Sequence, residues 1–386
     1  MEAKFYLKPG KEKSLERYHQ WVFSGAIQRK EGQPEDGDIV AVYTHQGQFL
    51  ARGHFNNGSI MVRVISFEDV ALDLNFWTSR LQMAYNLRNT LNLTENLETN
   101  VYRLVHGEGD FCPGLVIDYY NQTLVIQAHS KGIYKQVEII AEALKVVFGE
   151  VISCIILKCE RSVQGQDRVL FGESSKIQVQ ENGFSFIVDP LEGQKTGFFI
   201  DQRENRALLG KYAAGKKVMN LFGYTGGFSV YARGGGAALV HTIDVSEKAV
   251  QQANENIALN FNEPYHEGKA ADAFDFFKDL PVDYDIMVLD PPAFAKHQNA
   301  LSNARQAYIR LNKLAFEKIK PGGIVFTFSC SQVISKDIFR SAVFTAALQA
   351  NRKVSILHQL SQAADHPVNI FHPEAEYLKG LVVYVH

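Results

Sequence analysis

The chain has 386 residues, of which 46% are hydrophobic and 21% are charged, a composition typical of a protein with sizeable buried cores. Its length exceeds one ordinary domain and predicts two or three. A formal net charge of −2 excludes a uniformly basic surface but allows a local basic patch. No apolar run approaches the roughly 18 to 20 residues that a membrane span needs.

The cysteines and the N-terminus indicate a cytoplasmic protein. Four cysteines without the spacing of a disulfide framework fit a reducing compartment, where thiols stay free. The first residues, MEAKFYLKPGKEKS, lack the apolar core of a signal peptide. The His, Asp and Cys residues show no metal-ligand cluster in their spacing, so we expect no bound metal and no membrane association.

Residues 1–68 are expected to form a small β-barrel-like module. The stretches DGDIVAVYT, GQFLARGHFN and SIMVRVIS alternate apolar and polar residues and are separated by turn residues. This module is locally basic, because only Glu2, Glu12 and Glu16 oppose Lys4, Lys8, Lys11, Lys13, Arg17, Arg29 and Lys30 within the first 30 residues. Such a surface can meet the phosphates of a nucleic acid, although taken alone it is more often simply solvated.

Residues 72–190 are expected to form a central α+β domain. Apolar residues at helical spacing predict a connecting helix over 72–91 and an amphipathic helix over 133–147. The strand-like stretches GLVIDYYNQTLVIQAH and VISCIILKCE surround the second helix. The turn Glu181-Asn182-Gly183 predicts a hairpin near the end of the domain.

Residues 191–386 are expected to form an α/β domain with a doubly wound, Rossmann-like sheet. Strand-like stretches such as KKVMNLF, LVHTIDV, DYDIMVLD and GGIVFTFSC alternate with segments of helical periodicity. The final stretch, LKGLVVYV, has no clear helix before it, so it can enter the sheet antiparallel to its neighbours.

The first strand of this domain runs into a glycine-rich turn, NLFGYTGGFSVYA. Its glycines allow a tight turn and a close approach of the backbone to a ligand at the head of the next helix. The turn is neither G-x-G-x-x-G nor a P-loop, because it lacks the phosphate-holding lysine, so a cofactor without a pyrophosphate is favoured. We assign Phe222, Tyr224, Thr225 and Gly226 to cofactor contact.

Two acids complete the predicted cofactor site. Asp244 ends the second strand and can accept hydrogen bonds from ribose hydroxyls, while Asp272 follows the third strand and can receive an adenine amino group. Together with the turn they suit S-adenosylmethionine, an adenosine that carries a sulfonium group. For either acid the alternative is a helix N-cap, a common role of aspartate.

The end of the fourth strand, VLDPPAFAK, and the end of the fifth, FTFSCS, predict a catalytic pair. Ligands of doubly wound sheets bind at the carboxyl ends of the strands, where Asp290 and Cys330 should face each other. Carbon 5 of cytosine becomes nucleophilic once a thiolate has added to carbon 6, and a cysteine can supply that thiolate. Asp290 can hydrogen-bond the ring and is assigned to cofactor contact as well. The base that removes the carbon-5 proton stays unassigned.

Several long motifs resemble the RlmI-type ribosomal RNA large subunit (cytosine-5) methyltransferases over nearly the whole chain. The matching stretches are LFGYTGGFSVYA, VLDPPAFAK, FTFSCS, GQKTGFFIDQRENR, LVHGEGDFCPGLVIDYY and QAADHPV. The resemblance implies an N-terminal PUA domain, a class I methyltransferase domain, 23S ribosomal RNA as substrate and Cys330 as nucleophile. It also implies cofactor contacts from Gln194, Thr196, Phe199, Asp201 and Arg203.

One departure from the family pattern and two alternative functions have to be considered. Many RNA cytosine-5 methyltransferases outside this branch carry a second cysteine after the strand-four acid, where this chain has Pro291-Pro292. Related guanine and adenine N-methyltransferases also use Asp-Pro-Pro or Asn-Pro-Pro motifs without a thiol, so an RNA N-methyltransferase is the main enzymatic alternative. A catalytically inactive PUA-type RNA-binding protein is the other alternative. Similar proteins can be dimers, so a homodimer is possible.

Overall fold

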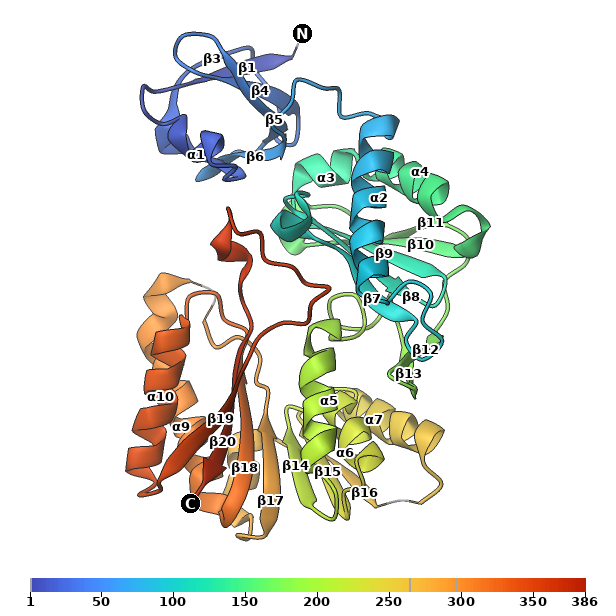
Figure 1. The fold of residues 1–386 in the computed structure, drawn as a ribbon, viewed down its shortest axis with the longest axis vertical. Helices are drawn as coiled ribbons and strands as arrows, with labels where there is room; N and C mark the ends of the chain where they lie inside the picture. Colours follow the sequence, from blue (N-terminus) through green and yellow to red (C-terminus); the bar gives the residue numbers. More distant parts are fainter. Residues whose placement is uncertain (1, 264, 296) are drawn as a thin grey trace. The chain divides into compact units, whose positions relative to one another are not determined.

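The computed structural model describes residues 2–263, 265–295 and 297–386 (Figure 1). The chain divides into two compact units by its internal contacts. Unit 1 comprises Met1–Gly183, Val188–Ile200 and Ala364–Ala375, and unit 2 comprises Phe184–Ile187, Asp201–Ala363 and Glu376–His386. The chain therefore passes between the units several times, and the predicted domain boundaries at 68 and 190 stay a prediction.

Unit 1 begins with a six-stranded sheet in the order β2-β6-β5-β4-β1-β3. Alternating apolar residues such as Val40, Val42, Val62 and Val64 point to one side and form its buried core with Phe5. Most of its strand pairs are antiparallel, and β1 and β4 are parallel. The strands are β1 (Ala3–Leu7), β2 (Trp21–Phe23), β3 (Ile27–Glu31), β4 (Ile39–Tyr43), β5 (Phe49–Phe55) and β6 (Ile60–Ser66), with α1 (Lys13–Glu16) after β1.

The second part of unit 1 is a five-stranded sheet in the order β11-β10-β9-β8-β7. Helices α2 and α4 bury residues such as Trp77, Leu81, Ile140 and Leu144 in its core. The strands are β7 (Val101–His106), β8 (Leu115–Tyr120), β9 (Thr123–Ala128), β10 (Cys154–Cys159) and β11 (Arg168–Phe171). The helices are α2 (Leu74–Thr90), α3 (Lys131–Lys135) and α4 (Val137–Phe148).

Helix α2 confirms the connecting helix predicted over 72–91, and α4 confirms most of the helix predicted over 133–147. The predicted start is wrong, because α3 occupies residues 131–135 as a separate helix. Two helices occupy that stretch and meet at Gln136, whose φ of −101° and ψ of 6° lie outside helical geometry. The Gln136 side chain donates to the carbonyl of Leu72 and bonds His54 at 2.7 Å. These contacts with preceding segments are invisible to hydrophobic periodicity.

A buried ion pair ties the segment Ala364–Ala375 into unit 1. The guanidinium of Arg88 is 0% exposed, pairs with Asp110 and donates to the carbonyl of Asp365 at 2.7 Å. The Asp365 carboxylate in turn accepts the backbone N–H of Arg103 at 2.9 Å. Removal of one partner of a buried ion pair costs about 3–5 kcal/mol, so these contacts hold the segment strongly.

A hairpin turn follows at the predicted position. Strands β12 (Ile177–Glu181) and β13 (Phe184–Val188) flank Asn182 and Gly183, whose φ angles are 49° and 80°. Positive φ at both central residues is the requirement of a two-residue hairpin turn.

Unit 2 is built on a seven-stranded sheet in the order β16-β15-β14-β17-β18-β20-β19, which confirms the predicted doubly wound α/β fold. The first five strands in this order are parallel, and β20 runs antiparallel between β18 and β19. The strands are β14 (Lys217–Leu221), β15 (Leu239–Asp244), β16 (His266–Ala270), β17 (Tyr284–Leu289), β18 (Ile319–Ser329), β19 (Val354–Leu360) and β20 (Lys379–Val385).

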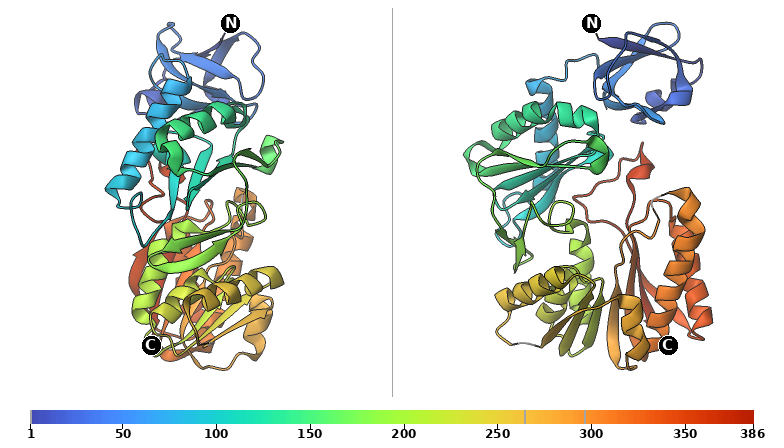
Figure 2. Two further views of the ribbon diagram at one scale, coloured as in Figure 1. Left: turned by 90° about the vertical axis from the view of Figure 1, so that its right-hand side faces the viewer. Right: turned by 180° about the vertical axis from the view of Figure 1, so that it is seen from behind.

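Helices cover both faces of this sheet (Figures 1 and 2). On β17, Met287 and Leu289 pack with α9 and α10, while Ile286 and Val288 pack with α5 and α6 on the other face. Strands that are buried on both faces have continuous apolar sequences, such as IMVL in β17. The helices are α5 (Arg203–Tyr212), α6 (Gly227–Gly234), α7 (Glu247–Asn260), α8 (Ala273–Phe276), α9 (Leu301–Lys318) and α10 (Lys336–Gln349).

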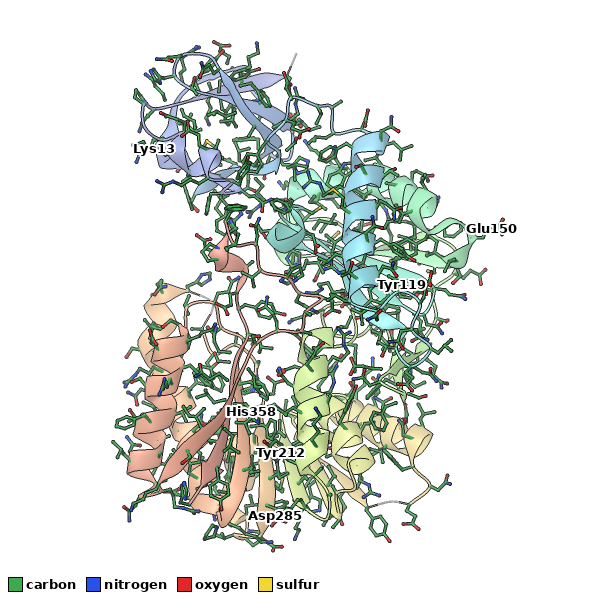
Figure 3. The ribbon with its side chains drawn as sticks, viewed as in Figure 1. Lys13, Tyr119, Glu150, Tyr212, Asp285 and His358 are labelled. Atoms are coloured by element: carbon green, nitrogen blue, oxygen red, sulfur yellow. The ribbon has the colours of Figure 1, made fainter. Side chains whose placement is uncertain are left out.

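A polar contact fastens the end of α5 to the edge of the sheet. The hydroxyl of Tyr212 and Nε2 of His358 on β19 lie 2.7 Å apart, and both residues are labelled in Figure 3. Among the described residues, no helix is long and apolar enough to cross a membrane.

Candidate active site

The glycine-rich turn between β14 and α6 holds an unusual backbone conformation. Phe222 and Tyr224 have φ angles of 58° and 46°, a left-handed region that costs a residue with a side chain on the order of 1–3 kcal/mol. Gly226 has a φ of 80° and begins α6. A Cβ atom on Gly223 would lie 2.4 Å from the methyl group of Thr242, so only glycine fits there. Strain of this kind clusters at ligand sites.

Asp244 shapes this turn. Its Oδ2 accepts the backbone N–H of Tyr224 at 2.9 Å, and its Oδ1 accepts the backbone N–H of Ser246 at 2.9 Å. The N-cap of α7 is Ser246, whose side chain accepts from Ala249. The N-cap alternative for Asp244 is therefore wrong.

Asp272 differs from Asp244 in its role. It is exposed, and its Oδ1 accepts the backbone N–H groups of Phe274 and Asp275 at 2.9 and 3.0 Å as the N-cap of α8. The N-cap alternative is therefore confirmed for Asp272. Its second carboxylate oxygen is not needed for the cap.

Thr225 is 2% exposed, and its carbonyl accepts from the buried side chain of Asn256 at 2.8 Å. This contact fastens the turn to α7. Asn256 itself lies in the middle of α7, so periodicity gives no hint of this contact.

Asp290 follows β17 at the carboxyl edge of the sheet, as predicted. Its Oδ2 accepts from Nε2 of Gln202 at 3.0 Å. Gln202 is 3% exposed, and its Oε1 accepts from Asn205 at 2.7 Å, which orients the amide. Sequence reasoning missed Gln202, although it stands inside the motif GQKTGFFIDQR between two residues that were assigned.

Cys330 follows β18, and β18 pairs with β17 in parallel, so the two strand ends meet as predicted. The Cys330 Sγ lies 3.9 Å from the carbonyl oxygen of Pro291, the residue after Asp290. The Ser331 hydroxyl donates to the carbonyl of Ala295 at 2.5 Å. Ser331 therefore joins the loop that carries the thiol to the loop that carries Asp-Pro-Pro.

Lys379 is a further residue of this site that sequence reasoning missed. It pairs with Ser329 in the antiparallel ladder of β18 and β20, and it is 5% exposed. Its Nζ donates to the carbonyls of Ser331 and Tyr377 at 2.6 Å each. Burial lowers the pKa of Lys379 to about 8, and the charge of Cys330 opposes that effect. An ammonium group beside a thiol favours the reactive thiolate.

The segment around GQKTGFFIDQR is divided between the two units. Asp201 and Arg203 belong to unit 2, where Asp201 accepts from the hydroxyl of Tyr377 at 2.6 Å and Arg203 begins α5 with 3% exposure. The residues of this segment that belong to unit 1 are Gln194, Thr196 and Phe199.

Within unit 1, Thr196 is 1% exposed and donates to Asp118 at 2.5 Å. Its hydroxyl also lies 2.9 Å from that of Tyr120. The Nζ of Lys195 lies 4.7 Å from the ring centre of Phe199. The predicted cofactor contacts of Gln194, Thr196 and Phe199 therefore stay a prediction.

Comparisons with known proteins assign the class of this fold and site. A PUA-like domain family matches residues 5–67, and a family of S-adenosylmethionine-dependent methyltransferases matches residues 157–369. A methyltransferase structure solved with SAH superposes with a TM-score of 0.87 at 25% identity and covers 100% of both chains. The chain is an S-adenosylmethionine-dependent methyltransferase with an N-terminal PUA-like domain.

Curated relatives define the particular family. The "Ribosomal RNA large subunit methyltransferase I" of Aeromonas hydrophila is 40% identical over 99% of both chains. The protein of the same name from Shewanella denitrificans is 39% identical over 100% of both chains. The chain belongs to the ribosomal RNA large subunit methyltransferase I family, as the sequence motifs indicated.

We predict that Lys379 sets the reactivity of the Cys330 thiol. Lys379→Met removes the charge, so the thiolate should be less favoured and alkylation near neutral pH should slow about tenfold. The effect should be largest below about pH 8, where the wild-type lysine is protonated. The measurement is the rate of iodoacetamide alkylation at Cys330 against pH, followed by peptide mass spectrometry.

Two variants serve as controls for this measurement. Lys379→Arg keeps the charge and should restore a pH profile close to that of the wild type. Lys353→Met removes an exposed lysine of the same unit and should leave the profile unchanged. An unchanged profile in Lys379→Met would contradict the assignment.

Proposed function

We propose that the protein methylates carbon 5 of a cytosine in 23S ribosomal RNA through a covalent adduct on Cys330. The observation that carries this proposal is the position of Cys330, whose Sγ lies 3.9 Å from the Pro291 carbonyl. The ammonium of Lys379 donates to the carbonyl of Ser331, the next residue along the chain. The names of the curated relatives support large-subunit ribosomal RNA as the substrate.

The glycine-rich turn and the adjacent acids fit S-adenosylmethionine. Gly223 and Gly226 leave room for the close approach of a nucleoside, and the turn contains no lysine for a pyrophosphate. Asp244 would accept the ribose hydroxyls, Asp272 would receive the adenine amino group, and Phe222, Tyr224 and Thr225 would line the site. Asp201 and Arg203 would flank it, with Gln194, Thr196 and Phe199 from the same motif. The cofactor supplies an electrophilic methyl group.

The proposed reaction begins with addition of the Cys330 thiolate to carbon 6 of the target cytosine. The sulfur–carbon bond forms as the 5,6 double bond breaks, and electron density moves to carbon 5, which then takes the methyl group. Loss of the carbon-5 proton restores the double bond and expels the thiolate, which leaves 5-methylcytosine and a regenerated Cys330. The lysine ammonium favours the thiolate both before addition and after elimination.

Asp290 would act on the ring rather than on the thiol. Its Oδ2 accepts from Gln202, so the carboxyl group is held in one orientation by a buried amide. From this position it would hydrogen-bond the cytosine ring and support its protonation while the thiolate adds. The target base has to leave a stacked helix for attack on its ring, so the enzyme would act on single-stranded or flipped-out RNA.

N-methylation of guanine or adenine remains the enzymatic alternative, because Asp-Pro-Pro motifs also serve that chemistry. It would leave Cys330 and the buried Lys379 without a catalytic role. A buried ammonium costs free energy, which an interaction with a thiolate offsets. Homodimer formation stays a prediction from the resemblance.

We predict that Asp244 binds the cofactor. Asp244→Asn should weaken S-adenosylmethionine binding about tenfold or more, because a hydrogen bond to a charged group is worth about 1.5–3 kcal/mol. Isothermal titration calorimetry with the full chain measures the affinity. Asp275→Asn, at an exposed acid of α8, should bind like the wild type. Equal affinities for Asp244→Asn and the wild type would remove Asp244 from the site.

The covalent mechanism predicts a trapped adduct. Ribosomal RNA that contains 5-fluorocytosine should form a denaturation-resistant complex in the presence of S-adenosylmethionine, because fluorine cannot leave as a proton does. Cys330→Ala should lose the adduct and the methylation of normal RNA, whereas Cys159→Ala should retain both. Methylation of normal RNA without any adduct, together with an active Cys330→Ala, would favour the N-methyltransferase alternative.

The basic N-terminal module is the proposed RNA-binding surface. Lys11 and Lys13 are exposed (Lys13 is labelled in Figure 3), whereas Arg29 pairs with Glu31 and stacks on Tyr6. Lysines that contact phosphates release counterions from the RNA. Each contact adds about 0.7–0.9 to the magnitude of the slope of log K against log salt.

We therefore predict that Lys11→Gln combined with Lys13→Gln weakens RNA binding and lowers the slope of log K against log salt by about one to two. Filter-binding assays at several salt concentrations measure the slope. Lys176→Gln combined with Lys216→Gln removes the same charge from two other exposed positions and should leave the slope unchanged. Identical slopes for both double variants would exclude this surface.

A further inference from the structure

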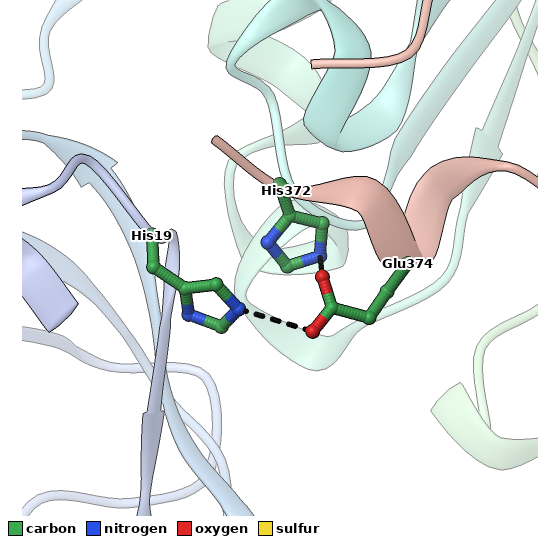
Figure 4. A group of neighbouring side chains, drawn as sticks. All are labelled: His19, His372 and Glu374. Carbon is green, nitrogen blue, oxygen red and sulfur yellow. Dashed lines mark hydrogen bonds and ion pairs between the residues drawn. The ribbon is translucent and has the colours of Figure 1, made fainter. Parts of the chain in front are cut away.

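Two histidines and a glutamate from opposite ends of the chain meet within unit 1. His19 follows α1 near the N-terminus, while His372 and Glu374 belong to the segment Ala364–Ala375. His19 and Glu374 are 355 positions apart in the sequence. Figure 4 shows the two imidazole rings next to each other, with the Glu374 carboxylate beside both. One ligand-type atom from each of the three residues lies within 4.8 Å of the other two.

The spacing of these atoms fits a tetrahedral metal ion. Nε2 of His19 lies 3.3 Å from Oε1 of Glu374, and Nε2 of His372 lies 3.8 Å from Oε2. In a tetrahedral zinc site with bonds of about 2.0–2.1 Å, two ligand atoms lie about 3.3 Å apart. The first pair therefore already has the required separation. The second contact involves the other carboxylate oxygen and is about 0.5 Å wider, so it would have to shorten on binding.

His372 supplies an independent reason for a bound ion. Its side chain is 0% exposed, and neither ring nitrogen has a hydrogen-bond partner among the described residues. An unsatisfied buried polar group costs about 1–3 kcal/mol, which a metal bond would offset.

Contacts with Trp21 hold the ring of the first histidine. Nδ1 of His19 lies 3.3 Å from both the carbonyl oxygen and the backbone nitrogen of Trp21, and Nε2 faces Glu374. The tautomer that donates from Nδ1 to the carbonyl leaves Nε2 free to bind a metal. Metal-binding histidines usually present their second nitrogen to such a carbonyl or carboxylate. The Trp21 indole donates to Glu108 at 2.8 Å, so a further carboxylate lies near the cluster. The negative charge of Glu108 and the positive charge of Arg63 act on His372 in opposite directions.

We propose that His19, His372 and Glu374 form a binding site for a zinc ion. Two imidazoles and one carboxylate match the His₂Glu sets that hold zinc, with the fourth position open to water because the Glu374 side chain is 46% exposed. The ion would fasten the segment Ala364–Ala375 to the N-terminal sheet, beside the Arg88–Asp365 contact. This proposal departs from the expectation of no metal and is independent of the proposed RNA chemistry.

The test is zinc binding by the full chain without a polyhistidine tag. After dialysis against a chelator, the wild type should bind one equivalent of zinc, measured by equilibrium dialysis and elemental analysis. Cobalt in its place should give the intense visible absorption of a tetrahedral site. Added zinc should raise the melting temperature of the wild type, because an ion that binds only the folded state stabilises it.

Three variants separate a ligand from a structural residue. Glu374→Gln keeps the shape of a half-exposed side chain and should weaken zinc binding about tenfold or more, and His19→Ala should do the same. His45→Ala, at an exposed histidine in the turn between β4 and β5, should bind zinc like the wild type. Less than one equivalent in the wild type, or equal affinity in a folded Glu374→Gln, would overturn the proposal.

Discussion

The site depends on the hydrogen bonding of three neighbouring strands, β17, β18 and β20. Parallel pairing of β17 and β18 aligns Leu289 with Thr327, so Asp290 and Cys330 follow the last pair of this ladder at the same edge of the sheet. Antiparallel pairing of β18 and β20 then places Lys379 opposite Ser329. A one-residue slip in either ladder would turn side chains to the other face and separate the thiol from the acid or the ammonium.

Polar contacts beyond the ladder restrain the loops at this edge. Ser331 joins its own loop to Ala295, Gln202 holds Asp290, and Asp244 holds the strained turn at Tyr224. Each contact joins a loop to a group on a different element, so the loops are held without regular structure of their own. A rigid strand edge with loops tied in this way is a scaffold on which reacting groups keep their geometry.

The sequence predicted the site residues that stand in a recognisable local motif. It missed the residues that reach the site only through contacts between segments distant in the sequence. Asp290 and Cys330 end apolar strands beside prolines or hydroxyls, and the parallel order of the sheet made their proximity predictable. Lys379 stands in an ordinary strand, and only the position of β20 beside β18 brings it to the thiol. The helix break at Gln136 and the meeting of His19 with Glu374 rest on long-range contacts that no periodicity encodes.

Both units are completed by the last part of the chain. Unit 1 needs Asp365 beside Arg88, and unit 2 needs β20, which ends one residue before the C-terminus and lies inside the sheet. Neither unit is a continuous stretch of sequence. A fragment of residues 1–200 would lack the partner that Asp365 offers to Arg88, and a fragment of residues 201–363 would lack β20.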